Sequence, residues 1–303
     1  SYEDEVQAVR QALDLGINYF DTAFAYGLGK SEENLGRILK QLKTPAVIST
    51  KIRLEDDALT DIKAVTIREV EAGLKRLQSD FVDLIQLHTR VVTGRQQDHR
   101  FGMTPGEILG RSGVLEGFKA MRDRGKVGYF GFTGLGDPAA LHEVVDSGAF
   151  HSFQAYYNLL NPSAGHPVPP ASSALDYGLL IDRAAAQSMG VAVIRVLAAG
   201  ALTSNPGAGG GSTPEPLSKG SEYSLDVQRA EKLKAALTVD GKGVTQTAIR
   251  FGLMNPKVST VLVGFSNTAH IDEAVACSGA PPLSTEQMAK IEKLWKNDFG
   301  SLN

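Results

Sequence analysis

The sequence has one cysteine, no long apolar segment and little net charge, and each of these scarcities excludes a class of protein. The single cysteine, Cys277, cannot form a disulfide within the chain, which is typical of a reducing compartment. No apolar run approaches the roughly 18 residues of a membrane-spanning helix, and the N-terminal segment is acidic. The formal net charge of −3 gives no reason to expect nucleic acid or an anionic membrane as a partner. We therefore expect a soluble, cytoplasmic protein.

Two phosphate-binding motifs are also missing. No G-x-G-x-x-G turn follows the first strand-like run. The segment from Gly27 to Ser31 resembles the end of a P-loop, but Phe24 stands where the full motif requires glycine. We interpret this segment as a turn followed by a helix start, with Ser31 as the N-cap and Glu33 and Asn34 in the first turn.

What the sequence does contain is the composition of a globular protein and a regular alternation of elements. Hydrophobic residues make up 42% and charged residues 21%. Strand-like runs, mostly apolar on both faces, alternate with amphipathic, helix-like stretches. Glycines at 16, 125, 148 and 190 follow four of these stretches, where a left-handed cap ends a helix. The predicted strands are 17–20, 46–50, 82–88, 129–133, 152–157, 191–197 and 259–263, and the predicted helices are 3–15, 31–42, 61–77, 114–124, 138–147, 175–189, 226–237 and 244–254.

This alternation predicts parallel strands joined by right-handed crossovers. The length of 303 residues fits an α/β fold in which residues 1–303 form one (β/α)8 (TIM) barrel domain. Only seven strands are visible, so a barrel would have its first strand absent from this sequence. An open doubly wound sheet is the structural alternative, because a barrel without one strand leaves an unpaired edge.

Three long connections follow predicted strands. They are residues 89–113, 158–174 and 203–225. In a barrel they would lie on the C-terminal face, where loops shape the substrate pocket. The first carries Arg90 and Arg95, which would either recognise an anionic or polyhydroxylated substrate or be solvated charge, with solvated charge favoured for Arg95. Any one of the loops could also be plain surface.

Titratable side chains end the first three predicted strands. Asp21, Lys51 and His88 come directly after apolar runs, and Tyr26 follows Asp21 by five residues. Neighbouring parallel strands lie about 5 Å apart, so these side chains would gather at one edge of the sheet. Each alone has a structural explanation, such as a cap or a solvated strand end. Together they form a group that can move a proton near neutral pH, which indicates an enzyme.

Further blocks of sequence surround these four residues, in the same order over nearly the whole chain. Together they resemble the aldo-keto reductase family, which implies a (β/α)8 barrel and an oxidoreductase that interconverts carbonyls (aldehydes, ketones or aldoses) and alcohols. The blocks are Gly16 to Ala23, Tyr26-Gly27, Ser31-Glu32, Leu35-Gly36, Ser49 to Lys51, Leu74 to Gln78, Asp83 to His88, Gly125 to Val127, Gly131 to Gly134, Gln154, Tyr157-Asn158 and Gly264 to Ser266.

The resemblance also implies roles for the four residues. Tyr26 would be the general acid that protonates the carbonyl oxygen, and the base in the reverse reaction. A free phenol titrates near pH 10, far from neutrality, and a neighbouring cation favours the phenolate; Lys51 is the candidate for that cation. Asp21 would hold Lys51 charged and in place, and His88 would orient the carbonyl.

Cofactor contacts follow from the same resemblance, since the family binds an extended nicotinamide dinucleotide without a G-x-G-x-x-G turn. Thr133 and Gln154 would bind the nicotinamide carboxamide. The family habit favours NADP(H) over NAD(H), and no metal is expected. The remaining expected contacts are Arg195, Leu197, Ala198, Gly200, Gly264, Phe265, Ser266, His270 and Glu273.

Three positions depart from the family pattern. The position that often stacks an aromatic ring on the nicotinamide falls near Ile194 or Arg195. His270 stands where relatives carry Gln or Arg near the 2′-phosphate, and Glu273 is followed by Ala274 instead of Asn. These departures leave the choice between NADPH and NADH open.

Two other functions compete with the reductase. One is an NADPH-binding regulatory or sensor subunit with little turnover, as some proteins of this fold are channel β-subunits. The other is a phosphate-binding barrel lyase or isomerase, which would bind no dinucleotide. The sequence does not identify the carbonyl or sugar substrate or the oligomeric state.

Overall fold

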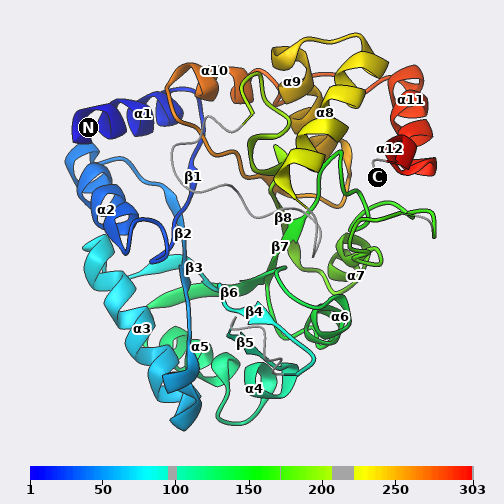
Figure 1. Ribbon diagram of the computed structural model, residues 1–303. Coiled ribbons are helices and arrows are strands. Elements are labelled where there is room, and N and C mark those ends of the chain that lie inside the picture. Colours follow the sequence, from blue (N-terminus) through cyan, green and yellow to red (C-terminus); the bar gives the residue numbers. More distant parts are fainter. Residues whose placement is uncertain (95–100, 171, 207–221, 302–303) are drawn as a thin grey trace. The chain divides into compact units, whose positions relative to one another are not determined.

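The computed structural model describes residues 1–94, 101–170, 172–206 and 222–301, and the chain divides into two compact units. The first unit comprises residues 1–154 and 186–190. The second comprises residues 155–185 and 191–303. In each unit parallel strands alternate with helices, as the sequence predicts (Figure 1).

In the first unit, five parallel strands pair in the order β1-β2-β3-β6-β7. Asp21 pairs with Ser49 between β1 and β2, and Lys51 pairs with Gln86 between β2 and β3. Because the strands run in one direction, their C-terminal ends lie at the same edge of the sheet. The strands are β1 (Tyr19–Asp21), β2 (Val47–Ile52), β3 (Val82–Leu87), β6 (Val127–Thr133) and β7 (Ser152–Tyr156), whose last two residues count with the second unit.

The helices of the first unit begin and end for local reasons that the sequence shows. In α1, the Ser1 side chain accepts from the Asp4 backbone N–H and Asp4 reaches back, which forms a capping box. Gly16, just after this helix, has a φ of 88°. Asp61 caps α3 in a similar way by accepting from the Ala64 backbone N–H. The helices are α1 (Tyr2–Asp14), α2 (Lys30–Leu42), the 3-10 turn η1 (Asp56–Thr60), α3 (Ile62–Leu77), α4 (Pro105–Leu109), α5 (Val114–Asp123) and α6 (Pro138–Asp146).

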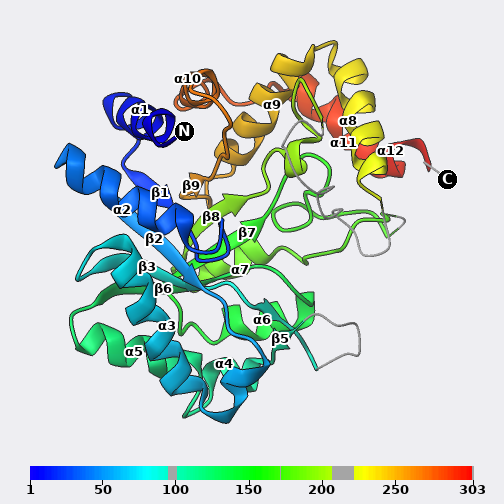
Figure 2. The same ribbon diagram turned by 60° about the vertical axis from the view of Figure 1, so that its left-hand side comes forward.

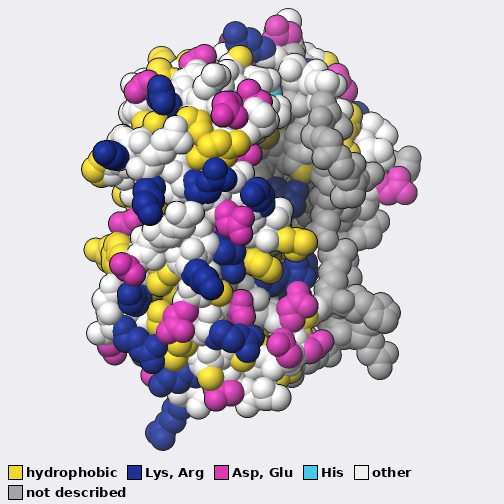
Figure 3. All heavy atoms as spheres, turned by 90° about the vertical axis from the view of Figure 1, so that its left-hand side faces the viewer, with side chains coloured by type: hydrophobic (Ala, Val, Ile, Leu, Met, Phe, Trp, Pro, Cys, Tyr) yellow, Lys and Arg dark blue, Asp and Glu magenta, His cyan; other side chains and the backbone are white. Residues whose placement is uncertain are grey.

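One face of the first unit is formed by α1, α2 and α3, which follow one another beside β1, β2 and β3 (Figure 1). In the described part of this face, Lys and Arg side chains alternate with Asp and Glu side chains (Figure 3). Mixed signs of this kind are typical of a solvated surface.

The second unit contains strands β8 (Gly190–Ile194) and β9 (Thr260–Val261), which are parallel neighbours with Ala192 paired to Thr260. Its core includes stacked rings from Tyr157 and Phe251, and the Trp295 indole N–H donates to the Leu159 carbonyl at 2.8 Å. Helices α8, α9 and α11 pack together in this unit (Figure 2). The helices are α7 (Leu180–Ala186), the 3-10 turn η2 (Ala198–Gly200), α8 (Tyr223–Leu237), α9 (Gly241–Met254), α10 (Ala269–Val275), α11 (Thr285–Lys296) and α12 (Asp298–Ser301).

Three predicted helix ends were wrong. Ser31 lies inside α2, whose N-cap is Gly29 in a left-handed conformation, because the Ser31 hydroxyl instead bonds Thr22 at 2.7 Å. The helix predicted over 175–189 begins only at Leu180, since Gly178 and Leu179 both have positive φ. The left-handed residue after this helix is Ser188, and Gly190 already begins β8.

One of the three long connections contains more structure than the sequence predicted. Residues 89–113 include two short parallel strands, β4 (Arg90–Val91) and β5 (Gly102–Met103), and the helix α4. The side chains of Arg95, His99 and Arg100 lie outside the described residues, as do residues 207–221. None of the helices in the described ranges has the length and hydrophobicity needed to cross a bilayer.

Candidate active site

Four of the residues singled out in the sequence lie within the first unit, at the C-terminal edge of its sheet. Asp21 is the last residue of β1, Lys51 lies near the end of β2, and His88 directly follows β3. Tyr26 lies in the segment between β1 and α2. Parallel pairing therefore brings an acid, an ammonium, an imidazole and a phenol to one edge.

Lys51 is the most enclosed of the four. Its side chain is 1% exposed, and its ammonium has three N–H groups, each with an acceptor. One donates to the Asp21 carboxylate, one to the Thr22 carbonyl at 2.9 Å and one to the Tyr26 hydroxyl at 3.3 Å. All three donors are used, so the position of the cation is fixed. This cation also lies 4.8 Å from the centre of the Tyr26 ring.

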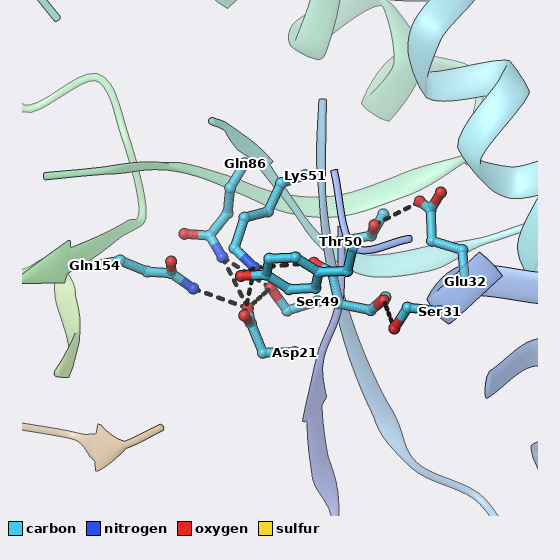
Figure 4. Close-up of polar contacts among 10 residues, drawn as sticks. Asp21, Ser31, Glu32, Ser49, Thr50, Lys51, Gln86 and Gln154 are labelled. Atoms are coloured by element: carbon cyan, nitrogen blue, oxygen red, sulfur yellow. Dashed lines mark hydrogen bonds and ion pairs between the residues drawn. The ribbon is translucent and has the colours of Figure 1, made fainter. Parts of the chain in front are cut away.

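The Asp21 carboxylate is the centre of a second set of contacts (Figure 4). Its Oδ2 faces Lys51, and its Oδ1 accepts from Ser49 Oγ at 3.0 Å, Gln154 Nε2 at 2.8 Å and Gln86 Nε2 at 3.4 Å. Ser49 in turn accepts from Gln86 at 2.8 Å. We call these contacts the Asp21 network: Asp21, Ser49, Gln86 and Gln154.

The Gln154–Asp21 hydrogen bond shows that the sheet of the first unit is strongly curved. It joins β7 to β1, which are separated by four strand spacings in the pairing order. In a flat sheet these strands would be about 19 Å apart at a spacing of about 4.8 Å. Two side chains cannot cover that distance, so the curvature brings the first and last strands of this unit together.

Tyr26 is held in a tight turn and is one of the exposed aromatic residues of the first unit. Its side chain is 43% exposed. Gly27, Leu28 and Gly29 all have positive φ, and the Gly29 N–H donates to the Phe24 carbonyl at 2.7 Å. The glycines suit this conformation because they have no Cβ to clash. The P-loop-like segment is thus a turn before a helix, as the sequence analysis favoured.

A buried carboxylate, Glu32, connects this turn to the strand that carries Lys51. Glu32 is fully buried in α2 and accepts from Thr50 Oγ1 at 2.6 Å and from Arg76 Nε at 2.6 Å. The Arg76 guanidinium in turn lies 4.7 Å from the centre of the Phe24 ring. A buried charge is stable only when it is paired in this way. The ion pair therefore joins α2, α3, β2 and the turn of Tyr26.

His88 is an uncharged imidazole at neutral pH. Burial, followed by the nearby charges of Lys51 and Arg53, lowers the pKa of His88 to about 4. Its ring meets that of Tyr26 edge to face, with 6.0 Å between the ring centres. At neutral pH it can donate one hydrogen bond to a ligand without carrying charge.

The sequence predicted no role for several residues of this site, although all of them lie within the blocks that resemble the family. They are Thr22, Glu32, Ser49, Thr50 and Gln86. A signal for two of them was present, since Ser49 and Gln86 are polar residues in apolar runs, two positions before Lys51 and His88. Side chains two apart in a strand point to the same face. Glu32 and Thr50 gave no such signal, because their pairing depends on how a helix packs on the sheet.

Comparison with known proteins identifies the family. A sequence profile of the aldo/keto reductase family matches residues 1–296. The chain belongs to the aldo/keto reductase family. This membership places it among oxidoreductases. The L-galactose dehydrogenase of Arabidopsis thaliana is 29% identical over 283 residues, which cover 90% of this chain and 77% of that protein.

Solved structures show the fold of this aldo/keto reductase. The holo form of an aldo-keto reductase from Bacillus halodurans matches with a TM-score of 0.71 at 23% identity and covers 98% of this chain and 88% of its own. An aldo-keto reductase from Klebsiella pneumoniae, solved in complex with NADPH, matches with a TM-score of 0.63 at 22% identity, over 97% and 86% of the two chains. The α/β fold predicted from the sequence, of the (β/α)8 barrel class, is confirmed.

In the first unit, two side chains bear on cofactor binding in this aldo/keto reductase. Thr133, the last residue of β6, is 1% exposed, and its Oγ1 has no hydrogen-bond partner among the described residues. A buried hydroxyl of this kind is costly unless a ligand completes it. The amide nitrogen of Gln154 is already engaged by Asp21. Its second amide N–H and its carbonyl oxygen have no partner in this hydrogen bond.

In the second unit, the expected contacts follow the neighbouring strands β8 and β9. After β8, Arg195, Ala198 and Gly200 all have positive φ, and the Gly200 N–H donates to the Leu197 carbonyl at 2.9 Å. This segment is therefore a tight turn. It begins at the same edge as the segment after β9, because the two strands are parallel.

The segment after β9 contains the other expected contacts. Gly264 has open space around its Cα, and Phe265 is 49% exposed. Both ring nitrogens of His270 lie near polar groups of its own loop, with Nε2 3.1 Å from Asn267 Nδ2. The Oε1 atom of Glu273 is buried without a hydrogen-bond partner among the described residues. Within those residues, no group of three or more His, Cys, Asp or Glu side chains could hold a metal ion.

Proposed function

We propose that this protein interconverts carbonyls and alcohols with NADP(H), and that Tyr26 is its general acid and base. The observation that carries the proposal is the fixed Lys51 ammonium, 3.3 Å from the Tyr26 hydroxyl and paired with Asp21 on its other side. A phenol beside a cation gives up its proton more readily than a free phenol does. Tyr26 is also an exposed residue, which supports a role in contact with a substrate.

Each residue has a distinct part in the reduction. Tyr26 gives its proton to the carbonyl oxygen, and Lys51 stabilises the phenolate that remains. Asp21 balances the charge of Lys51 and holds it in place. His88 donates a hydrogen bond that orients the carbonyl, and it remains neutral at physiological pH because burial lowers its pKa to about 4. In alcohol oxidation the Tyr26 phenolate accepts the proton instead.

NADPH, when bound, would supply the hydride that reduces the carbonyl carbon. The unpartnered hydroxyl of Thr133 and the carbonyl oxygen of Gln154 are suited to bind the carboxamide of the nicotinamide. In the second unit, the turn from Arg195 to Gly200 and the segment from Gly264 to His270 offer backbone groups for phosphates, and Glu273 offers an acceptor. The NADPH complex of the relative from Klebsiella pneumoniae supports NADPH over NADH.

The substrate class that we propose is a small aldehyde, ketone or aldose. The support for a sugar is the likeness to the L-galactose dehydrogenase of Arabidopsis thaliana. The long connections at 89–113, 158–174 and 203–225 would set the choice among these substrates, as such loops do in barrel enzymes.

The test is the loss of NADPH absorbance with a panel of aromatic aldehydes and aldoses, using the natural protein and a Tyr26→Phe variant. We expect turnover to fall by about 10²- to 10⁴-fold in the variant, which is the usual contribution of a general acid. NADPH binding should be unchanged, because the phenyl ring is retained. Tyr129→Phe is a matched control, since Tyr129 is also exposed, at 61%.

Each other outcome has a clear meaning. Equal rates in the natural protein and the Tyr26→Phe variant would remove Tyr26 from the mechanism. Tight NADPH binding without turnover in any of the three proteins would favour a sensor subunit over a reductase. No binding of NADPH or NADH would contradict both.

A further inference from the structure

The Asp21 carboxylate has an unusual share of the hydrogen-bond donors in the first unit. Lys51 takes its Oδ2, while Ser49, Gln86 and Gln154 all point at its Oδ1 (Figure 4). Ser49 and Gln86 are fully buried and Gln154 is 1% exposed. Their contacts with the carboxylate are therefore not shared with bulk water, and they act at close to full strength.

Strand pairing fixes two of these donors. Ser49 is the direct pairing partner of Asp21 between β1 and β2, and Gln86 is the pairing partner of Lys51 between β2 and β3. Gln86 also donates to Ser49 at 2.8 Å, so its amide holds the serine hydroxyl in the orientation that donates to Asp21. The two side chains thus form a chain of hydrogen bonds that ends on the carboxylate.

These hydrogen bonds to Asp21 increase the positive potential that the Lys51 ammonium exerts at the Tyr26 oxygen. Each hydrogen bond to Oδ1 stabilises the ionised carboxylate and draws its negative charge away from Lys51. Without them, the carboxylate would hold the charge of Lys51 more tightly and could also rotate. Less of the positive potential of the ammonium would then reach the Tyr26 oxygen, 3.3 Å away.

We propose that Ser49 and Gln86 are positioning residues that act through Asp21 and Lys51 and set the pH at which Tyr26 loses its proton. The proposal rests on the proposed function of Tyr26 as acid and base. Neither residue touches the substrate. Ser49 and Gln86 would thereby determine the pH range in which alcohol oxidation is fast, because this reaction needs the Tyr26 phenolate.

The other charged groups around the Asp21 network do not titrate in the relevant range. Burial, together with the nearby charge of Asp21, raises the pKa of Tyr19 to about 12 against the lowering effect of a hydrogen bond with Ser49, and burial lowers the pKa of His88 to about 4. Arg53 places a further charge near His88, and Glu32 is paired with Arg76. We assign the alkaline rise in the rate of alcohol oxidation to Tyr26, because in the proposed mechanism this reaction needs its phenolate.

The experiment measures the pH dependence of alcohol oxidation for Ser49→Ala, Gln86→Leu and the double variant. We expect the midpoint of the alkaline rise in rate to move upward by about 0.5 to 1 pH unit in each single variant. At a fixed pH below the midpoint, the rate should fall by about 3- to 10-fold, while the KM for the alcohol changes little. The double variant should shift less than the sum, because both residues belong to one hydrogen-bond chain.

Control variants separate this role from a general loss of structure. Thr247→Val removes another buried hydroxyl, one that donates to the Gly243 carbonyl at 2.7 Å in α9 of the second unit, and it should leave the midpoint in place. Ser49→Thr keeps a hydroxyl donor at position 49 and should restore the natural midpoint. An unchanged midpoint in Ser49→Ala and Gln86→Leu, or an equal shift in Thr247→Val, would overturn the proposal.

A second measurement works even if no substrate is turned over. The ultraviolet absorbance of the phenolate is titrated in each variant, and the same titration in the matching Tyr26→Phe background is subtracted. The difference gives the titration of Tyr26 alone. An upward shift without any turnover would support the role of Ser49 and Gln86 while the proposed reductase fails; no shift with normal turnover would refute that role alone.

Discussion

Two buried threonines in the first unit have the same unusual feature. The hydroxyl oxygens of Thr66 in α3 and Thr133 at the end of β6 lack a hydrogen-bond partner among the described residues, although both side chains are almost fully buried. An unpartnered buried hydroxyl costs about 1 to 3 kcal/mol. Only Thr133 is among the residues that we expect to contact the cofactor. A comparison of variants at these two positions can therefore distinguish a hydroxyl that binds the cofactor from one that is only imperfectly packed.

Replacing each of these threonines by valine should give the same change in stability but different changes in NADPH binding. Both Thr66→Val and Thr133→Val remove an unpartnered hydroxyl and keep the shape, so we expect the free energy of unfolding to rise by about 1 kcal/mol in each. Thr133→Val should also weaken NADPH binding by about 10-fold, because a hydrogen bond to the ligand is lost. Thr66→Val should bind NADPH normally. Denaturant unfolding and fluorescence titration check the two effects, and equal NADPH affinities would count against Thr133 as a contact.

At the residue scale, polar site residues that end a strand were easier to find in the sequence than polar site residues inside a strand. Asp21, Lys51 and His88 could be found because a polar residue that ends an apolar run stands out. Ser49 and Gln86 were overlooked, because polar residues inside such runs look like interruptions until the pairing partners are known. The contact between Gln154 and Asp21 spans 133 positions and depends on the curvature of the sheet, which no local pattern contains.

At the scale of elements, α2 and α3 approach each other closely at one glycine. A Cβ placed on Gly36 in α2 would lie 2.1 Å from the carbonyl oxygen of Leu77, the last residue of α3. Backbone cannot move aside as a flexible side chain can. Any larger residue at position 36 must therefore push the two helices apart, and with them the ion pair of Glu32 and Arg76 that joins them.

Gly36→Ala should destabilise the protein even though alanine is the better helix former. We expect the free energy of unfolding to fall by about 2 to 3 kcal/mol, since overpacking outweighs the gain in helix propensity of about 1 kcal/mol. Gly106→Ala is the matched control. Gly106 is also helical, but its nearest neighbour to an added Cβ is 4.0 Å away, so this variant should be neutral or slightly stabilised. Urea unfolding of both variants distinguishes the cases, and equal stabilities would show that α2 can shift without cost.

The sequence predicted the main elements but passed over several helices. All seven long strand runs are present, although the last shortens to Thr260–Val261. Helices α4 and α11 were not predicted, yet Thr104 and Ser284 each begin a capping box with the residue three positions later. That signal is local and readable. The start of the turn after β8 was instead predicted as strand, up to residue 197, because its first left-handed residue is Arg195 rather than glycine.

At the scale of the whole molecule, buried histidines make stability depend on pH. Burial lowers the pKa of His88, His151 and His166 in the folded protein, that of His88 to about 4. An unfolded chain binds these protons near pH 6.5. Between these values the unfolded state holds more protons than the folded state, so stability is full above pH 6.5 and falls as the pH drops toward 4.

His88 alone should account for about 3 kcal/mol of this loss at pH 4, from a difference of about 2.5 pH units at about 1.36 kcal/mol each. A His88→Asn variant lacks the group and should lose less stability between pH 6.5 and 4 than the natural protein does. Chemical denaturation at a series of pH values measures both curves. Parallel curves would show that His88 is already protonated in the folded state or remains neutral in the unfolded one.

In the proposed mechanism, the hydrogen bond from Gln154 to Asp21 would make activity depend on complete assembly of the sheet in the first unit. It forms only when the five strands of the first unit are paired and curved. A slip of one residue in any of them would turn the relevant side chain to the opposite face. In a partly assembled chain the Asp21 carboxylate would therefore not be held in position, and Lys51 would lack its fixed ion-pair partner. In the proposed mechanism, only chains whose strands pair in the correct register would therefore carry out the chemistry.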